Sequence, residues 1–136
     1  MNIIIDTNLW ISFAISKRLA AMLSLLTNPA LEIYVCDELL TEFARISKKA
    51  KIRKYITEDD VQGTYKLIER YCRHAQIRRK ASSSVRDKKD LYLLSFAETI
   101  SADFIITGDK DLLVLQCHAQ TRIVTYTEFA NLMKRN

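Results

Sequence analysis

The segment DFIITGDKDLL, residues 103–113, predicts a buried strand that ends abruptly in a turn. Its first half is an apolar, β-branched run of the kind that forms strands in a covered sheet. The turn carries two carboxylates, Asp109 and Asp111, after Gly108, one of only two glycines in the chain. Because glycine has no Cβ, we expect Gly108 to allow the chain to turn sharply at the tip of this strand.

Apolar runs of the same kind recur along the chain. The four predicted strands cover residues 2–6, 31–36, 102–107 and 121–126. Apolar residues at helical spacing fill the intervals, and the predicted helices cover about 8–28, 37–50, 58–75, 88–101 and 127–134. Asp37 and Thr57 are suitable N-caps for two of these helices. Strands that alternate with helices predict an α/β sandwich around a central parallel sheet.

The remaining sequence predicts one domain over residues 1–136, without repeats or linkers. Residues 74–81 predict a further, more exposed strand, and SSSV at 82–85 predicts a mobile loop. No apolar run is long enough to cross a bilayer, and the N-terminus lacks the basic start of a signal peptide. We therefore expect a cytoplasmic protein without membrane contact.

Cysteine and histidine offer little for catalysis. Cys36, Cys72 and Cys117 are odd in number and widely separated, which predicts neither a disulfide framework nor a metal knuckle. His74 and His118 have no partner at metal-ligand spacing. The chemistry of the chain is therefore expected to rest on carboxylates.

The positive charge is concentrated in the middle of the chain. The net charge is +5, but 15 of the 21 Lys and Arg residues lie between Arg45 and Lys89, against five acids. Such a distribution is typical of a protein that binds a phosphate backbone through one part and a cation through another. A solvated helical surface rich in lysine would show the same distribution of charge. The two dense basic tracts are Lys48, Lys49, Lys51, Arg53 and Lys54, and then Arg78, Arg79 and Lys80.

Four carboxylates are predicted to meet. Asp6 and Asp109 each follow a predicted strand, and the carboxyl ends of parallel strands lie at the same edge of a sheet. Glu42 shares a helix face with the apolar residues three before and four after it. Asp90 lies in the first turn of the apolar stripe of its helix. Each acid alone could equally be a turn, cap or helix-edge residue.

Carboxylates crowded in this way repel one another unless a cation lies among them. Ligands that are all oxygen, without His or Cys, favour Mg²⁺ or Mn²⁺. Such an ion activates a bound water and neutralises the charge on phosphoryl oxygens. The acids therefore predict metal-dependent hydrolysis of phosphodiester bonds.

Four segments of the chain resemble the PIN-domain family, and specifically the toxin components of toxin–antitoxin pairs. They are IIIDTNLWIS (3–12), VCDELLTEF (35–43), RDKKDLYLLSFAETISADFIITGDKDLL (86–113) and RIVTYTEF (122–129). The resemblance implies a PIN-like three-layer sandwich with a central parallel sheet. It also implies a Mg²⁺- or Mn²⁺-dependent endoribonuclease that cleaves RNA, is inhibited by a cognate antitoxin and forms a homodimer.

Matched by motif, the catalytic and metal-binding acids of the family fall on Asp6, Glu42, Asp90 and Asp109, the four positions that spacing had already selected. Asp111 also matches, as a further metal ligand or water-mediated contributor. The resemblance assigns to Asn8 and Thr107 the hydrogen bonds that orient the first and last carboxylates.

The motif around the third acid departs from the pattern of the family. Relatives carry Pro where this chain has Lys88 and a polar or acidic residue where it has Leu91. Asp87 could therefore exchange roles with Asp90.

Several alternatives stay open. The basic tracts could bind RNA or could dock an antitoxin tail. Tyr55 and Tyr71 could stack on bases, whereas Trp10 is expected in the core.

The function of the whole chain also has alternatives. A degenerate, non-catalytic PIN fold could serve as an RNA or protein adaptor. A magnesium phosphatase of the haloacid-dehalogenase kind would need an Asp where this chain has Asn8, and a response-regulator receiver would need paired acids after the first strand.

Overall fold

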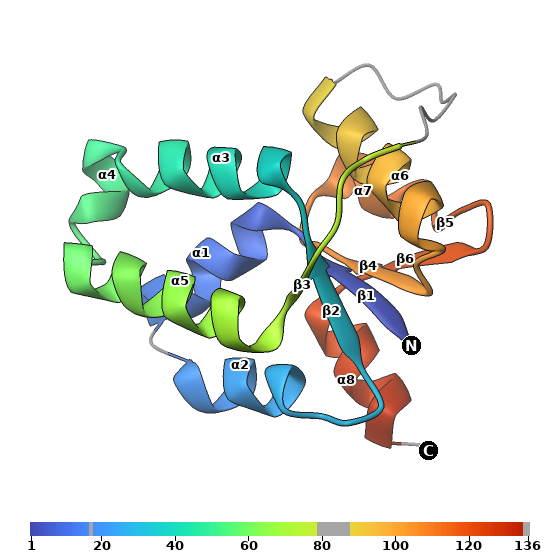
Figure 1. Cartoon of the computed structure of the whole chain (residues 1–136), viewed down its shortest axis with the longest axis horizontal. Coiled ribbons are helices and arrows are strands. Elements are labelled where there is room, and N and C mark those ends of the chain that lie inside the picture. Colours follow the sequence, from blue (N-terminus) through green and yellow to red (C-terminus); the bar gives the residue numbers. More distant parts are fainter. Residues whose placement is uncertain (17, 79–87, 135–136) are drawn as a thin grey trace.

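A computed structural model describes residues 1–16, 18–78 and 88–134. In these residues six strands form one sheet in the order β3-β2-β1-β4-β6-β5 (Figure 1). The strands are β1 Asn2–Ile5, β2 Glu32–Val35, β3 Arg73–His74, β4 Phe104–Ile106, β5 Cys117–His118 and β6 Thr121–Val124.

Parallel pairing aligns the carboxyl ends of the central strands. Ile4 of β1 lies beside Tyr34 of β2 and Ile105 of β4, and Ile105 in turn lies beside Ile123 of β6. The predicted α/β fold with a central parallel sheet is thus confirmed. The short strand β5 is a difference from the prediction, since it runs antiparallel to β6. Two residues are too few to show any periodicity in the sequence.

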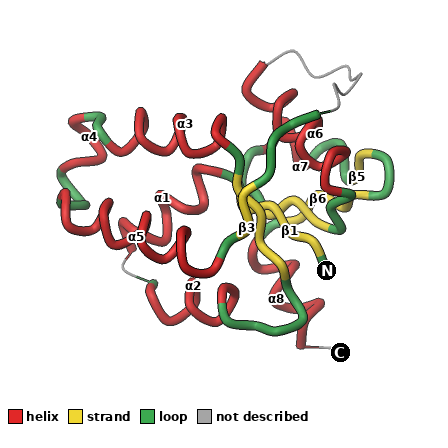
Figure 2. Tube along the Cα trace, in the orientation of Figure 1, coloured by secondary structure: helices red, strands yellow, loops and turns green. Residues whose placement is uncertain are grey.

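Helices cover both faces of the sheet (Figures 1 and 2). In both views α6 and α7 lie on one side and α1, α2 and α8 on the other, while α3, α4 and α5 form a hairpin that extends away from the strands. The helices are α1 Thr7–Ser16, α2 Leu19–Leu26, α3 Asp37–Ser47, α4 Ala50–Arg53, α5 Glu58–Tyr71, α6 Lys88–Ile100, α7 Lys110–Leu113 and α8 Tyr126–Lys134.

Several predicted helices are shorter than the apolar spacing indicated. The helix expected over 8–28 is two helices, α1 and α2, and the one expected to reach residue 50 ends at Ser47 before α4. The helix expected to reach residue 75 ends at Tyr71, because Cys72 adopts an extended conformation and leads into β3. A strand was expected over 74–81, and β3 contains only His74 of that range. Residues 79–81 and the loop expected at 82–85 lie outside the described residues.

The two predicted helix starts differ in outcome. Thr57 is the N-cap of α5: its hydroxyl accepts a hydrogen bond from the Asp60 N–H at 3.1 Å, and the Asp60 carboxylate accepts one from the Thr57 N–H at 2.8 Å. This reciprocal arrangement is a capping box. The N-cap of α3 is Cys36, so Asp37, which was expected to be the cap, is the first residue of that helix.

The hydrophobic core surrounds β1, whose residues Ile3, Ile4 and Ile5 are fully buried. Trp10 is also fully buried, as expected for a core residue, whereas Tyr55 is exposed. No helix in the described ranges is both long and apolar enough to span a bilayer.

Candidate functional site

The site begins where β1 and β4 end side by side. Asp6 directly follows β1, and Thr107 directly follows β4. The Asp6 N–H donates to the Ile106 carbonyl at 2.9 Å, which extends the pairing of the two strands by one bond. The Thr107 hydroxyl donates to Oδ2 of Asp6 at 2.7 Å, and both side chains are almost fully buried. The end of β4 therefore holds the carboxylate at the end of β1.

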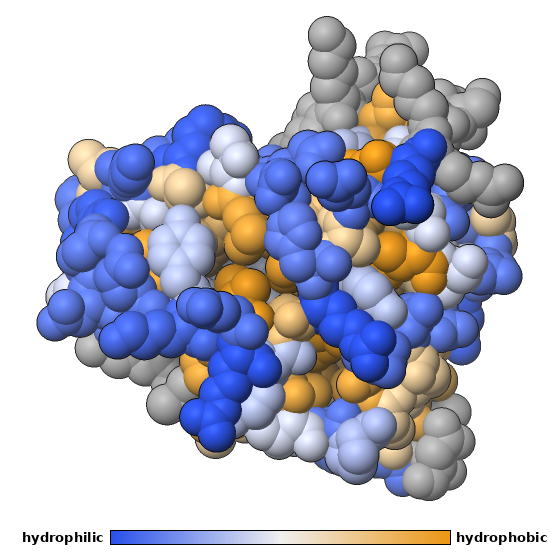
Figure 3. Space-filling view, viewed as in Figure 1, coloured by the Kyte–Doolittle hydropathy of each residue, from blue (hydrophilic) through white to orange (hydrophobic). Residues whose placement is uncertain are grey.

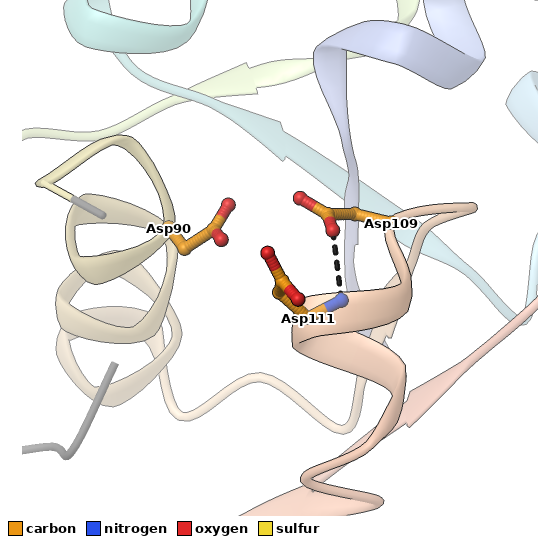
Figure 4. A group of neighbouring side chains, drawn as sticks. All are labelled: Asp90, Asp109 and Asp111. Atoms are coloured by element: carbon orange, nitrogen blue, oxygen red, sulfur yellow. Dashed lines mark hydrogen bonds between the residues drawn. The ribbon is translucent and has the colours of Figure 1, made fainter. Parts of the chain in front are cut away.

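Thr107 also organises the turn that carries Asp109. Its hydroxyl oxygen accepts a hydrogen bond from the Asp109 N–H at 3.0 Å. Asp109 is the N-cap of α7, and its Oδ1 accepts a bond from the Asp111 N–H at 2.9 Å (Figure 4). One hydroxyl thus connects Asp6 to the loop of Asp109, while the cap bond fixes the direction of the Asp109 side chain.

Three carboxylates converge on one space. Asp90 comes from the first turn of α6 and is almost fully buried, Asp109 is half-buried, and Asp111 is exposed. One oxygen from each of these three carboxylates lies within 4.8 Å of the others, and Figure 4 shows the side chains pointing toward one another. The group is assembled from α6 and α7, helices that are separated by a strand in the sequence.

Glu42 approaches this region from α3, and its side chain is buried. The Tyr92 hydroxyl, two residues beyond Asp90 on α6, donates to Oε1 of Glu42 at 3.3 Å. Burial raises the pKa of Tyr92 far above its usual value, and the negative charges of Glu42 and Asp6 add to this effect, while a hydrogen bond with Thr7 opposes it. Tyr92 therefore remains a phenol that can donate to Glu42.

The structure brings the predicted acids together in two ways. Asp90, Asp109 and Asp111 form the close group. Asp6 is joined to this group through Thr107, and Glu42 is joined to α6 through Tyr92.

Two other predicted residues are not part of this arrangement. Asn8 lies exposed in the first turn of α1, and its side chain makes no hydrogen bond within the described ranges. Asp87 lies outside those ranges.

Gly108 does not have the conformational role that the sequence suggested. Its φ is not positive, and a Cβ added there would meet no atom within 4 Å. The fold itself would therefore accept a side chain at this position, so the expectation that the sharp turn depends on the missing Cβ is wrong. What the missing side chain leaves is open space beside Asp109.

The first basic tract lies away from the three acids. Lys48, Lys49, Lys51 and Lys54 surround α4, at the end of α3 that is remote from the sheet (Figure 1). The Arg53 guanidinium is occupied within the fold, since Nε donates to the Ser47 carbonyl at 2.7 Å and Nη2 pairs with Glu58 at 2.8 Å. Arg78 is exposed beyond β3, while Arg79 and Lys80 lie outside the described residues.

Both histidines pair with carboxylates, which sequence spacing did not predict. Nε2 of His74 lies 2.8 Å from Asp37, and Nε2 of His118 lies 2.8 Å from Glu98. Tyr92 is the other residue that sequence reasoning missed. The available signal was a tyrosine two positions after the predicted acid, between the apolar residues Leu91 and Leu93.

The three converging carboxylates suit a small divalent cation. They offer only oxygen, the ligand type preferred by Mg²⁺ and Mn²⁺. One oxygen from each carboxylate lies within 4.8 Å of the others, so Asp90, Asp109 and Asp111 are the residues that would hold such a cation between them.

The family model of the PIN domain matches residues 2–111. The chain belongs to the PIN-domain family. The matched range of this PIN domain includes every acid described above, from Asp6 to Asp111. A comparison with curated protein sequences finds no match.

The fold of this PIN domain is also found in a solved complex. A chain in the structure of VapBC2 from Rickettsia felis, bound to a DNA fragment from the promoter, superposes with a TM-score of 0.57. The similarity covers 90% of the present chain and 97% of the other, at 16% sequence identity. At this identity the likeness concerns the fold.

Proposed function

We propose that this PIN domain is a Mg²⁺- or Mn²⁺-dependent endoribonuclease that hydrolyses phosphodiester bonds of RNA, and that it is the cytoplasmic toxin of a toxin–antitoxin pair. The observation that carries the proposal is the convergence of Asp90, Asp109 and Asp111 within 4.8 Å. Family membership and the resemblance to the toxin branch support it.

The proposed catalytic and metal-binding residues are Asp6, Glu42, Asp90 and Asp109, with Asp111 as a further ligand. A bound cation would supply a water of lowered pKa and would neutralise charge on the phosphoryl oxygens. Thr107 keeps the Asp6 carboxylate in place through its 2.7 Å hydrogen bond. Glu42, whose Oε1 accepts a hydrogen bond from the Tyr92 hydroxyl at 3.3 Å, would join the metal site from α3. No protein nucleophile is required.

RNA is proposed to bind through its backbone. The lysines around α4 and the exposed Arg78 are free to contact phosphates, with Arg79 and Lys80 continuing the second tract in the sequence. Arg53 is the exception in the first tract, because its bonds to Ser47 and Glu58 hold the α3–α5 hairpin together. We expect its substitution to affect stability more than RNA affinity.

The cognate antitoxin is proposed to dock in an apolar groove of about 490 Å³ between α1, α2 and α5. The lining side chains are Phe13, Ala14, Met22, Leu23, Thr64 and Leu67, and the acids Asp59 and Asp60 lie at its rim. This chemistry fits an amphipathic antitoxin segment with a basic residue at the rim. A homodimer, which the resemblance implies, stays a prediction.

Gly63 supports an occupant for this groove. It lies within α5 and lines the groove, its φ is not positive, and an added Cβ would meet nothing within 4 Å. Glycine in a helix interior costs about 1 kcal/mol relative to alanine. Neither the backbone conformation nor the packing of the chain by itself requires glycine at this position. A partner whose atoms lie close to the backbone of α5 would require it, because a Cβ would then be in the way.

The proposal is tested by incubating the purified chain with tRNA, ribosomal RNA and single-stranded oligonucleotides, in Mn²⁺, in Mg²⁺ or in EDTA. We expect metal-dependent cleavage that Asp6→Asn and Asp90→Asn abolish. Asp59→Asn, an exposed acid at the distant groove, is the matched control and should retain full activity. Cleavage by either active-site variant would show that the assigned site is wrong.

The adaptor alternative makes a different prediction for metal binding. A cation that binds the folded chain raises the melting temperature with its concentration by mass action. A melting temperature unchanged by Mn²⁺, together with no cleavage of any RNA, would favour the adaptor.

A further inference from the structure

We propose that the outer edge of β3 binds an extended, acidic segment of a partner protein, which adds a strand to the sheet. The inference goes beyond the proposed function and requires neither metal nor RNA cleavage. It rests on the free backbone of β3, on a hollow at each side of that strand and on the charge of the side chains around them.

The main chain of β3 faces outward at alternate residues. β3 is an edge strand that pairs with β2, with His74 beside Val35. The Ala75 N–H donates to the Val35 carbonyl at 3.0 Å. Because successive residues of a strand direct their polar groups to opposite edges, the N–H and C=O of His74 and Gln76 point away from β2. Among the described residues, no hydrogen bond outside the strand pairing involves the His74 main chain.

A hollow lies on each face of the sheet at this edge, and His74 borders both. On the side of α3 and α5, an apolar hollow of about 360 Å³ is lined by Val35, Leu40, Tyr65, Ile68 and Cys72, with Glu69 at its rim. On the side of α6, a hollow of about 420 Å³ is lined by Ala75, Gln76, Arg78, Thr99 and Ile100. Figure 3 shows apolar surface on both sides of the polar band that lies over β3.

These hollows would receive alternate side chains of an added strand, because side chains along a strand point to opposite faces. The α3–α5 hollow suits an apolar side chain. At the α6 hollow, Arg78 is exposed and makes no ion pair within the described ranges. Arg73 faces the same side of the sheet, where it pairs with Glu32 at 3.0 Å. The α6 side therefore suits a carboxylate, and the expected segment alternates apolar and acidic residues.

The same charges disfavour a second copy of this chain as the occupant. Pairing two copies of β3 edge to edge would bring Arg73 and Arg78 of each copy toward those of the other. Like charges on adjacent strands are destabilising, and cations on an edge strand typically prevent self-association. A partner segment with acidic residues would instead be attracted by Arg73 and Arg78.

The test uses the full chain and a fluorescent seven-residue peptide that alternates Glu and Leu, titrated by fluorescence anisotropy. His74→Pro deletes the outward N–H and leaves the Ala75 N–H that pairs with β2, while His74→Ala removes the side chain only. We expect binding to weaken about tenfold or more in His74→Pro but to persist in His74→Ala. Arg78→Glu should weaken binding of this peptide and improve binding of the Lys–Leu version.

Circular dichroism establishes that each variant is folded. If His74→Pro fails to fold, a peptide with N-methylated backbone amides gives the same test on the unaltered chain and should not bind. Equal affinity of the Glu and Lys peptides, or undiminished binding of either backbone-blocked form, would overturn the proposal. A dimer in sedimentation experiments that His74→Pro dissociates would overturn it in favour of self-pairing.

Discussion

The hydroxyl of Thr107 is a small group on which the geometry of the acidic site depends. It donates to Asp6 and accepts from the Asp109 N–H, so it holds a carboxylate of one strand and the loop of the next. The hydroxyl of Tyr92 has a comparable role for Glu42, to which it donates a hydrogen bond. Carboxylates that must share one cation repel one another, so neutral neighbours that fix their positions are part of the site.

Thr107→Val keeps the shape of the side chain and removes both hydrogen bonds. We expect cleavage to fall by about 10- to 100-fold, the effect typical of losing a residue that orients a metal ligand. The free energy of unfolding should fall by about 1–3 kcal/mol, because buried polar groups lose their partners. Kinetics and urea unfolding measure the two effects. Thr107→Ser is the control, and it should retain most activity; equal activity in the Val variant would contradict the role assigned to the hydroxyl.

Tyr92→Phe removes one hydroxyl and leaves the ring. We expect weaker metal-dependent cleavage because Glu42 loses its donor, with a stability change of about 1 kcal/mol. Initial rates at several Mn²⁺ concentrations separate a loss of metal affinity from a loss of turnover. Rates that match the parent chain at every concentration would show that Tyr92 does not act through Glu42.

At the scale of elements, the ends of helices were harder to predict than their existence. Apolar spacing continues through residues 8–28, yet the chain folds as α1 and α2. The spacing of apolar residues reports which face packs inward, and it does not report where packing against another element requires a bend. The cap at Thr57 was predictable because its partner, Asp60, is three residues away.

Gly63→Ala tests the inferred role of this glycine in α5. We expect the free energy of unfolding to rise by roughly 0.5–1 kcal/mol, because alanine favours the helix and the added Cβ meets open space. Gly63→Leu should fill part of the groove and weaken binding of the cognate antitoxin. Lys66→Ala, on an exposed part of the same helix, is the control for binding. Antitoxin affinity unchanged in Gly63→Leu would place the antitoxin elsewhere.

At the scale of the whole molecule, the protein surrounds several weak acids with apolar side chains. Burial raises the pKa of Cys36 and of Cys72 to about 12, and it raises the pKa of Tyr65 and Tyr92 as well. Each of these groups binds its proton more tightly in the folded chain than in the unfolded chain. The contribution to stability is complete below the unfolded pKa and is lost as the pH rises toward the folded value.

We therefore expect the free energy of unfolding to decrease above about pH 9, where the cysteines of the unfolded chain begin to ionise. Urea unfolding between pH 7.5 and pH 11 measures this decrease. The double variant Cys36→Ala, Cys72→Ala should show a smaller decrease than the parent over the same range. A free energy of unfolding that stays constant to pH 11 would contradict the expected shifts.

Local patterns in the sequence determined the fold class and the candidate acids of this protein. Asp6 and Asp109 follow short apolar strands, and Glu42 and Asp90 occupy inward positions of helices, so strand and helix periods place all four. The resemblance had named Thr107 and Asp111, but the tertiary structure decided which acids they meet: Thr107 contacts Asp6, and Asp111 lies beside Asp90. It also brought Tyr92 to Glu42, a contact that the sequence did not predict. It also decided that Gly108 needs no special backbone conformation. These contacts join residues as many as 101 positions apart, and no local period carries information about such distant pairs.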